Sequence, residues 1–417
     1  MGQKGWAKLV TVLWVLICIF MFAGVRECLA ISAWTRKYKV GCDHCHRPNV
    51  PRLNVEGHTF RKLGFRFPDE IGKKPDYKEI GDYLAARLRF QYNYSDGEEV
   101  DAVSSFAFNN ITLFYAGPVT ENLTVFGEIE WEDEDEIVVG AYGSWLFGTA
   151  DRYLNVRAGQ MHTLGRVGWA GFDRPSGIST TGILGGDINA SPVPFQISED
   201  QRGVELAFGP TRDARVIVQV LNGLNFDGVG NRAGNDVDTN KDVLLAYEQI
   251  LDSKGSGFTL FGYRGVWHQR PGVTPLFLPD SGDSTKFIFY RYGLTASILF
   301  DIFPAGYSEI LGGAMFSDDK FPDDYPTRSH DRVRGQAYFV ELEQYFHNAS
   351  VFARADFIND DAKFVKDNRG GAWVNRYTVG SAYMVNDYLR LALEVFGQDA
   401  RDEERQYGTT VEALLNF

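Results

Sequence analysis

After residue 30 the sequence contains no apolar run long enough for a membrane-spanning helix, which needs about twenty consecutive apolar residues. It has no phosphate-binding loop, no dinucleotide-binding fingerprint and no H-E-x-x-H run, so nucleotide use and zinc hydrolysis have no support. No basic cluster suggests nucleic-acid binding. Cysteine is scarce, with four residues in a chain of 417, and two of these, Cys18 and Cys28, lie within the first thirty residues.

The other two cysteines belong to the run Cys42-Asp43-His44-Cys45-His46, which has the C-x-x-C-H spacing of haem attachment. Two thiols at this spacing can add across both vinyl groups of one haem, and the following histidine is placed to ligate the iron. The alternatives are a structural disulfide and half of a zinc site, but a zinc site needs a second ligand pair, which the sequence lacks. We therefore predict one covalent haem c on Cys42 and Cys45, with His46 as the proximal ligand.

The second axial ligand has several candidates. His58 is the nearest downstream histidine, and its alternative is a plain loop histidine. Met161 and Met315 are predicted to point into a barrel lumen, where either thioether could reach the iron or simply fill a gap. Three apolar side chains are predicted to cover the porphyrin: Leu53, Phe60 and Phe65.

The first thirty residues have the features of a secretory signal. Lys4 and Lys8 precede an apolar stretch over 9–25, and residues 28–30 form a small-residue cleavage site. A retained membrane anchor is the alternative, because the apolar stretch approaches the length of a span. We expect a signal at 1–30, a haem-bearing segment and tether at 31–81, and a barrel at 82–417.

Alternating apolar and polar residues recur through the rest of the chain. In 84–94, for example, one face carries leucine and aromatic residues and the other carries Arg87, Arg89, Gln91 and Asn93. Clear repeats follow at 123–131, 351–357 and 389–395. Further segments begin near residues 102, 137, 153, 202, 214, 243, 257, 286, 305, 334, 371 and 407. The pattern predicts an all-β, antiparallel transmembrane barrel of about sixteen strands in a bacterial outer membrane, in contact with its lipid.

The predicted connections alternate in length, as expected for short periplasmic turns and long extracellular loops. A last alternating strand ends on Phe417, as in many outer-membrane barrels. The predicted inward faces are rich in charge, which fits either a solvated pore lining or a paired network packed against a plug. These residues are Arg87, Arg89, Arg157, Arg354 and Arg390 with Glu128, Glu130, Glu205, Glu341, Glu343 and Glu394.

Short stretches around the haem motif carry a resemblance to a known family. They are Trp34-Thr35-Arg36-Lys37-Tyr38, Pro51-Arg52-Leu53-Asn54, Gly57-His58-Thr59-Phe60 and Gly64-Phe65. With the predicted barrel, they resemble the fused outer-membrane cytochrome–porins of iron-oxidising bacteria. The resemblance implies an Fe(II):cytochrome c oxidoreductase, in which extracellular Fe(II) is the electron donor and a periplasmic c-type cytochrome is the acceptor.

Two other functions are compatible with the same residues. One is a conduit of the same build for another extracellular donor or acceptor, and the other is a transport porin with a cytochrome gate. The chain is acidic, with a formal net charge of −13, and carboxylates gather on predicted extracellular loops such as 132–136 and 318–324. Such loops could concentrate Fe²⁺, or bind Ca²⁺ and Mg²⁺ at the lipopolysaccharide surface. Placement of the haem segment inside the lumen is a further hypothesis.

Overall fold

The computed structural model describes most of the chain after residue 31. The described residues are 32–76, 79–97, 101–132, 137–162, 174–183, 195, 197, 200–223, 225–226, 231–232, 239–269, 285–303, 306–320, 332–360, 372–400 and 405–417. The predicted signal at 1–30 and large parts of the predicted acidic loops, including 133–136, lie outside them.

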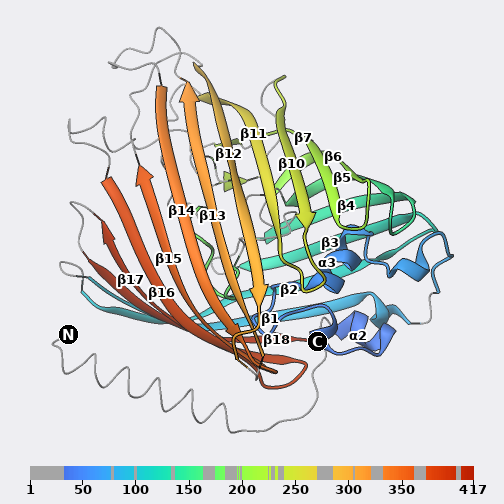
Figure 1. The fold of residues 1–417 in the computed structure, drawn as a ribbon, viewed down its shortest axis with the longest axis horizontal. Helices are drawn as coiled ribbons and strands as arrows, with labels where there is room; N and C mark the ends of the chain where they lie inside the picture. The colour runs from blue at the N-terminus through green and yellow to red at the C-terminus, as the bar shows by residue number, and fades with distance from the viewer. Residues whose placement is uncertain are drawn as a thin grey trace.

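Sixteen antiparallel strands form a closed barrel (Figure 1). They are β1 Leu84–Gly97, β2 Val103–Pro118, β3 Leu123–Glu132, β4 Ile137–Gly148, β5 Tyr153–His162, β6 Asp200–Gly209, β7 Ala214–Leu221, β10 Asp242–Ile250, β11 Gly257–Gln269, β12 Thr285–Phe300, β13 Tyr307–Lys320, β14 Arg332–Tyr345, β15 Ala349–Asp360, β16 Ala372–Met384, β17 Leu389–Ala400 and β18 Gln406–Asn416. β1 pairs with β18 and closes the wall. The barrel prediction is confirmed, and every strand begins within two residues of its predicted start.

The two faces of the wall differ as the alternation predicts. Apolar side chains such as Phe90, which is 47% exposed, Ile129 and Val379 lie on the outer face. Inward-facing polar side chains such as Glu128 and Arg354 are buried. A closed sheet satisfies every strand's backbone hydrogen bonds, and its apolar outer face suits lipid. Among the described residues, no helix is long and apolar enough to cross a membrane.

Short elements precede the barrel, and one helix among them packs against inward-facing side chains of its wall. They are α2 Ser32–Tyr38, the 3-10 turn η1 Cys42–His44, α3 Val55–Lys62, η2 Pro68–Glu70 and η3 Ile80–Asp82. We call residues 32–76 and 79–83 the lumen segment. In Figure 1, α3 is the blue helix drawn near β3. Its contacts place it against the inside of the wall, since it reaches inward-facing side chains of β5 and β10.

The lumen segment lies at the end of the barrel that carries the short turns. The Nη2 atom of Arg36 in α2 donates to the carbonyls of Gly81 and Leu84, at 2.7 and 3.0 Å, where β1 begins. The Cys42 Sγ atom lies 3.6 Å from the carbonyl oxygen of Asp387, in the turn between β16 and β17. The haem motif is therefore at the short-turn end of the lumen, opposite the long loops.

A small separate sheet of β8 Asn225–Phe226 and β9 Asn231–Arg232 lies within one of the long connections. Another long connection differs from prediction. The sequence suggests that the loop after β5 lies outside, but its described part at 174–183 contacts inward-facing side chains of β15 and β17. This part of the loop therefore lies inside the barrel.

Candidate functional site

The C-x-x-C-H run forms a compact turn at the barrel wall. Cys42 is 5% exposed, Cys45 is half-buried, and neither forms a disulfide. Burial, reinforced by the charges of Glu56 and Asp43, raises the pKa of Cys45 to about 12. Because the thiolate is the reactive form, Cys45 is a poor nucleophile once the segment is docked.

Asn54 and Gly57 hold the motif in shape. The Asn54 side chain donates to the carbonyls of Asp43 and His44 at 2.8 and 3.1 Å, and its backbone N–H donates to the Cys45 carbonyl at 3.0 Å. The same side chain caps α3 by accepting from the Gly57 N–H at 3.0 Å. A Cβ atom on Gly57 would collide with the Cys45 backbone. Through these contacts Asn54 and Gly57 hold the backbone of the motif in its turn.

His46 is prepared to act as a ligand. Burial lowers its pKa to about 4, although the nearby carbonyls of Pro51 and Arg52 oppose the shift. Its imidazole is therefore neutral at pH 7, which is the ligating form. The buried Nδ1 atom has no well-aligned hydrogen-bond partner within the described part of the chain. Two thiols outside any disulfide and a neutral imidazole form a donor set that fits a covalently attached haem.

An aromatic cluster connects the lumen segment to the wall. The Trp34 ring stacks on Phe65 at 5.2 Å between centroids, Phe65 stacks on Phe126 of β3 at 5.5 Å, and Phe126 stacks on Tyr142 of β4 at 5.1 Å. Phe60 is buried in the same cluster, whereas Leu53 pairs with His46 through a backbone bridge. Packing of Leu53, Phe60 and Phe65 on a porphyrin stays a prediction.

Two arginines fasten the segment to the opposite wall. Arg52 donates to Glu309 of β13 at 2.5 Å, and Arg47 lies 3.5 Å from the other carboxylate oxygen of Glu309. The Arg47 guanidinium also lies over the rings of Tyr307 and Tyr345, at 5.6 and 5.2 Å from their centroids. All three charged side chains are almost completely buried, so the pair has little competition from water.

The helix α3 is attached to a third part of the wall. Its His58 Nε2 atom lies 3.8 Å from a carboxylate oxygen of Glu248 in β10. Desolvation lowers the pKa of His58 to about 3, despite this carboxylate. Asn155 of β5 donates to the Lys62 carbonyl at 3.0 Å, and Arg157 donates to the Arg61 carbonyl at 3.3 Å. The lumen segment is therefore held from several sides of the barrel.

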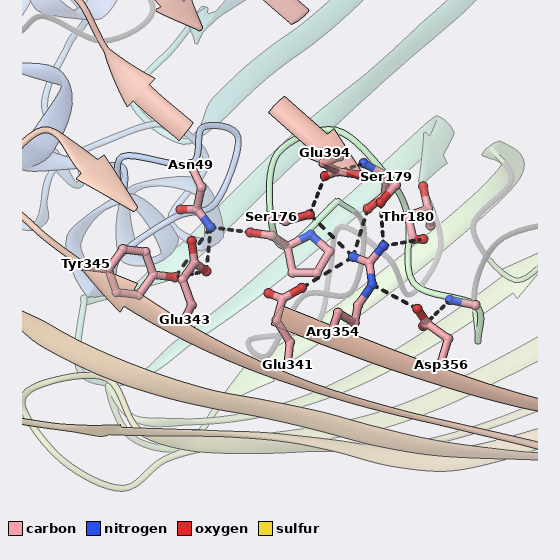
Figure 2. Close-up of polar contacts among 12 residues, drawn as sticks. Asn49, Ser176, Ser179, Thr180, Glu341, Glu343, Tyr345, Arg354, Asp356 and Glu394 are labelled. Carbon is pink, nitrogen blue, oxygen red and sulfur yellow. Dashed lines mark hydrogen bonds and ion pairs between the residues drawn. The ribbon is translucent and has the colours of Figure 1, made fainter. Parts of the chain in front are cut away.

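Figure 2 shows how the 174–183 loop meets the wall and the segment. Glu394 of β17 accepts from the Ser176 hydroxyl at 2.8 Å and from the Ser179 N–H at 3.1 Å. Arg354 of β15 donates to Ser179 and forms an ion pair of 3.4 Å with Glu341. From the lumen segment, Asn49 donates to the Pro175 carbonyl and to Glu343, which joins the two inner segments.

The inward charges thus form a paired network that packs against inner segments, rather than a solvated lining. Besides the contacts above, Arg157 pairs with Glu205 at 3.3 Å and Arg87 with Glu130 at 2.9 Å. Arg390 forms an ion pair with Glu412 and donates to the carbonyls of Val50 and Gly177. The sequence offered both interpretations, and the contacts favour the second.

The two methionine candidates are buried, as inward-facing residues should be. Met161 lies next to the last residue of β5, and Met315 belongs to an apolar cluster with Ile183, Phe195 and Ile197. That cluster contains no residue of the lumen segment among the described residues. The structure therefore does not bring Met315 to the haem motif, and a role of either methionine as a ligand stays a prediction.

Comparison with known proteins identifies the fold. An anion-selective porin from Comamonas acidovorans superposes with a TM-score of 0.55 at 10% identity, covering 80% of this chain and 98% of the porin. OmpT of Vibrio cholerae superposes with a TM-score of 0.53 at 11% identity, covering 80% of this chain and 97% of OmpT. Salmonella typhi OmpF, solved in complex with daunomycin, superposes with a TM-score of 0.52 at 12% identity, covering 80% of this chain and 97% of OmpF. No protein-family model and no curated protein matches the chain.

The chain therefore has the fold of bacterial outer-membrane porins. With its apolar outer face, this fold confirms the predicted place in a bacterial outer membrane, with short periplasmic turns and long extracellular loops. These porins are almost fully covered by four fifths of the chain.

Replacing His58 with glutamine tests its role as the second axial ligand. We expect the visible spectrum of the haem-loaded protein to stay unchanged, because His58 is directed at Glu248 on the wall. Absorption spectra of the oxidised and reduced protein measure this, and His347→Gln in an exposed turn is the matched control. A shifted Soret band in His58→Gln alone would instead identify His58 as the ligand.

Proposed function

We propose that the chain is an outer-membrane electron-transfer protein with one haem c bound to Cys42, Cys45 and His46. In this proposal it acts as an Fe(II):cytochrome c oxidoreductase, which oxidises extracellular Fe(II) and passes each electron to a periplasmic c-type cytochrome. The observation that carries the proposal is the haem motif itself, braced by Asn54 and Gly57 and fastened inside a porin-type barrel.

The residues of the chain would divide the work. A bound haem supplies a reversible one-electron carrier, and the protein supplies binding, orientation and a dry environment. His46 is neutral and buried, as an iron ligand has to be. The ion pair of Arg52 with Glu309 and the contacts of Asn49 hold the lumen segment against the barrel wall. The aromatic cluster around Phe65 would keep water away from one side of the lumen segment.

The position of the motif supports a periplasmic acceptor. Cys42 lies beside Asp387, in one of the short turns. A soluble cytochrome on the periplasmic side could therefore approach the haem edge closely. The donor side is more distant, since the long loops lie at the other end of the barrel. In this proposal Fe(II) gives up its electron on the extracellular side, which keeps the insoluble ferric product away from the cell interior.

A transport porin with a cytochrome gate is the second candidate, and the porin fold favours it. The two proposals differ in conductance. A transport porin should give large open channels in planar bilayers, whereas a barrel filled by the lumen segment and the 174–183 loop should not. A conduit for another electron donor or acceptor should likewise give no large open channels.

Anaerobic addition of Fe(II) to the oxidised, haem-loaded protein tests the main proposal. We expect rapid reduction of the haem, seen as sharpened α and β bands in the visible spectrum. Dithionite provides the control for a reducible haem, and planar-bilayer recordings of the same preparation measure conductance. If dithionite reduces the haem and Fe(II) does not, iron is not the donor.

A further inference from the structure

A second group of ligand-type side chains lies in the lumen, apart from the haem motif. Glu128 comes from β3, His162 is the last residue of β5, and Asp200 is the first residue of β6. His162 and Asp200 are directly opposite each other in the β5–β6 ladder. One ligand atom from each of the three residues lies within 4.8 Å of the others. The group is therefore assembled by the barrel from distant parts of the sequence.

The imidazole lies between the two carboxylates. Its Nε2 atom is 2.9 Å from Glu128 Oε1, and its Nδ1 atom contacts Asp200 Oδ1. Each ring nitrogen therefore faces one carboxylate oxygen. The side chains of Glu128, His162 and Asp200 are 6, 18 and 15% exposed. An imidazole flanked by carboxylates, with so little water around it, is a donor set that suits a divalent cation.

The wall leaves space for this arrangement. Gly140 of β4 is opposite Glu128 in the ladder, and a Cβ atom there would lie 3.0 Å from Glu128 Oε1 and 3.1 Å from its Cγ. Any larger residue at this position would push the carboxylate aside. The absence of a side chain at Gly140 therefore leaves room for the Glu128 side chain.

We propose that Glu128 and the Nε2 atom of His162 bind a first-row divalent transition-metal ion, while Asp200 stays hydrogen-bonded to Nδ1 and orients the ring. Metal–ligand distances of about 2.0–2.2 Å put the ligand atoms of one ion roughly 3–4 Å apart, so small side-chain rotations suffice. Imidazole combined with carboxylates suits iron, manganese or zinc better than calcium or magnesium. A carboxylate that keeps its hydrogen bond to the other ring nitrogen orients the imidazole.

The site lies on the route that the proposed function requires. His162 and Asp200 are at the long-loop ends of their strands, the end of the barrel at which extracellular Fe(II) would arrive. Glu128 is two residues from Phe126 on the same inward face of β3, and Phe126 stacks on Phe65 of the lumen segment. Assignment of the ion as Fe(II) rests on the proposed function, but the metal site itself does not.

Metal binding is tested on the full-length, haem-loaded protein in detergent. Mn²⁺ is the probe, followed by electron paramagnetic resonance, with excess Ca²⁺ present to occupy carboxylates on the outer loops. We expect one Mn²⁺ per chain that Zn²⁺ displaces. Affinity should fall at least tenfold in His162→Gln and in Glu128→Gln, since each removes a ligand. The matched controls are Glu130→Gln, on the same strand, and His347→Gln, and both should bind as the parent does.

Equal Mn²⁺ binding in all variants, or no stoichiometric binding, would overturn the site. Gly140→Val gives a second check, because it should displace Glu128 and weaken binding without removing a ligand. The role in iron oxidation is tested separately by the rate of haem reduction with Fe(II). If the site variants lose Mn²⁺ and are reduced by Fe(II) as fast as the controls, the metal site stands and its assignment as the Fe(II) site is wrong. If Fe(II) reduces no variant and not the parent, the proposed function fails while the metal site stands.

Discussion

Replacing both Cys42 and Cys45 with alanine is expected to abolish covalent haem while leaving the barrel folded. The two thioether bonds need both sulfur atoms, and His46 alone cannot retain haem through denaturation. The wall is closed by its own strand pairing between β1 and β18 and does not depend on the motif. Haem staining of denaturing gels measures the covalent haem, and the mobility shift of unheated samples measures the folded barrel.

The matched control uses the remaining cysteines. Cys18→Ala with Cys28→Ala lies in the predicted signal, so the mature protein should stain for haem as strongly as the parent. Either single replacement, at Cys42 or at Cys45, leaves one sulfur and should reduce the yield of haem protein. Full staining of the Cys42→Ala, Cys45→Ala protein would show that the motif does not carry a covalent haem.

Much of the fold was predictable because barrel strands have a strictly local signal. In β15 and β17 every second residue faces lipid, so the alternation is present in the sequence without knowledge of the neighbours. The signal is weaker in β13, where Gly312 and Gly313 interrupt it. Glu309, the main anchor of the lumen segment, lies in this strand and was not among the predicted inward carboxylates.

The candidate site was predictable only where its residues are close in sequence. Cys42, Cys45 and His46 are recognisable from spacing alone, because haem chemistry fixes that spacing. The bracing by Asn54 and Gly57 depends on how the chain turns back on the motif. The sequence shows Asn54 and Gly57 close to the motif, but it does not show the contacts that they make with it.

Contacts across the lumen could not be predicted from the sequence. The 174–183 loop was expected outside, because loop length says nothing about the direction in which a loop folds. Its position depends on Arg354 and Glu394, which come from strands far along the chain. Likewise, Glu128 and His162 meet only because the strand register brings them together. Register is a property of the closed barrel and not of any one segment.

Glu309→Gln is expected to release the lumen segment from the wall. The change keeps the shape of the side chain but leaves Arg47 and Arg52 buried without their carboxylate. Breaking a buried ion pair by removing one partner costs about 3–5 kcal/mol. Every 1.4 kcal/mol is about tenfold in an equilibrium constant, so the undocked fraction should rise more than a hundredfold. Trypsin, which cleaves after lysine and arginine, measures this fraction when opening is fast compared with cleavage.

Two further variants separate docking from general loss of structure. Lys254→Gln breaks an exposed ion pair with Asp301 at the same end of the barrel, and exposed pairs contribute only about 0–1 kcal/mol. It should leave the cleavage rate close to that of the parent. Adding Arg47→Met and Arg52→Met to Glu309→Gln removes the stranded charges, so docking should recover in part. Unheated gel mobility confirms that each barrel is folded. Cleavage of Glu309→Gln at the rate of the parent would mean that this ion pair does not hold the segment in the lumen.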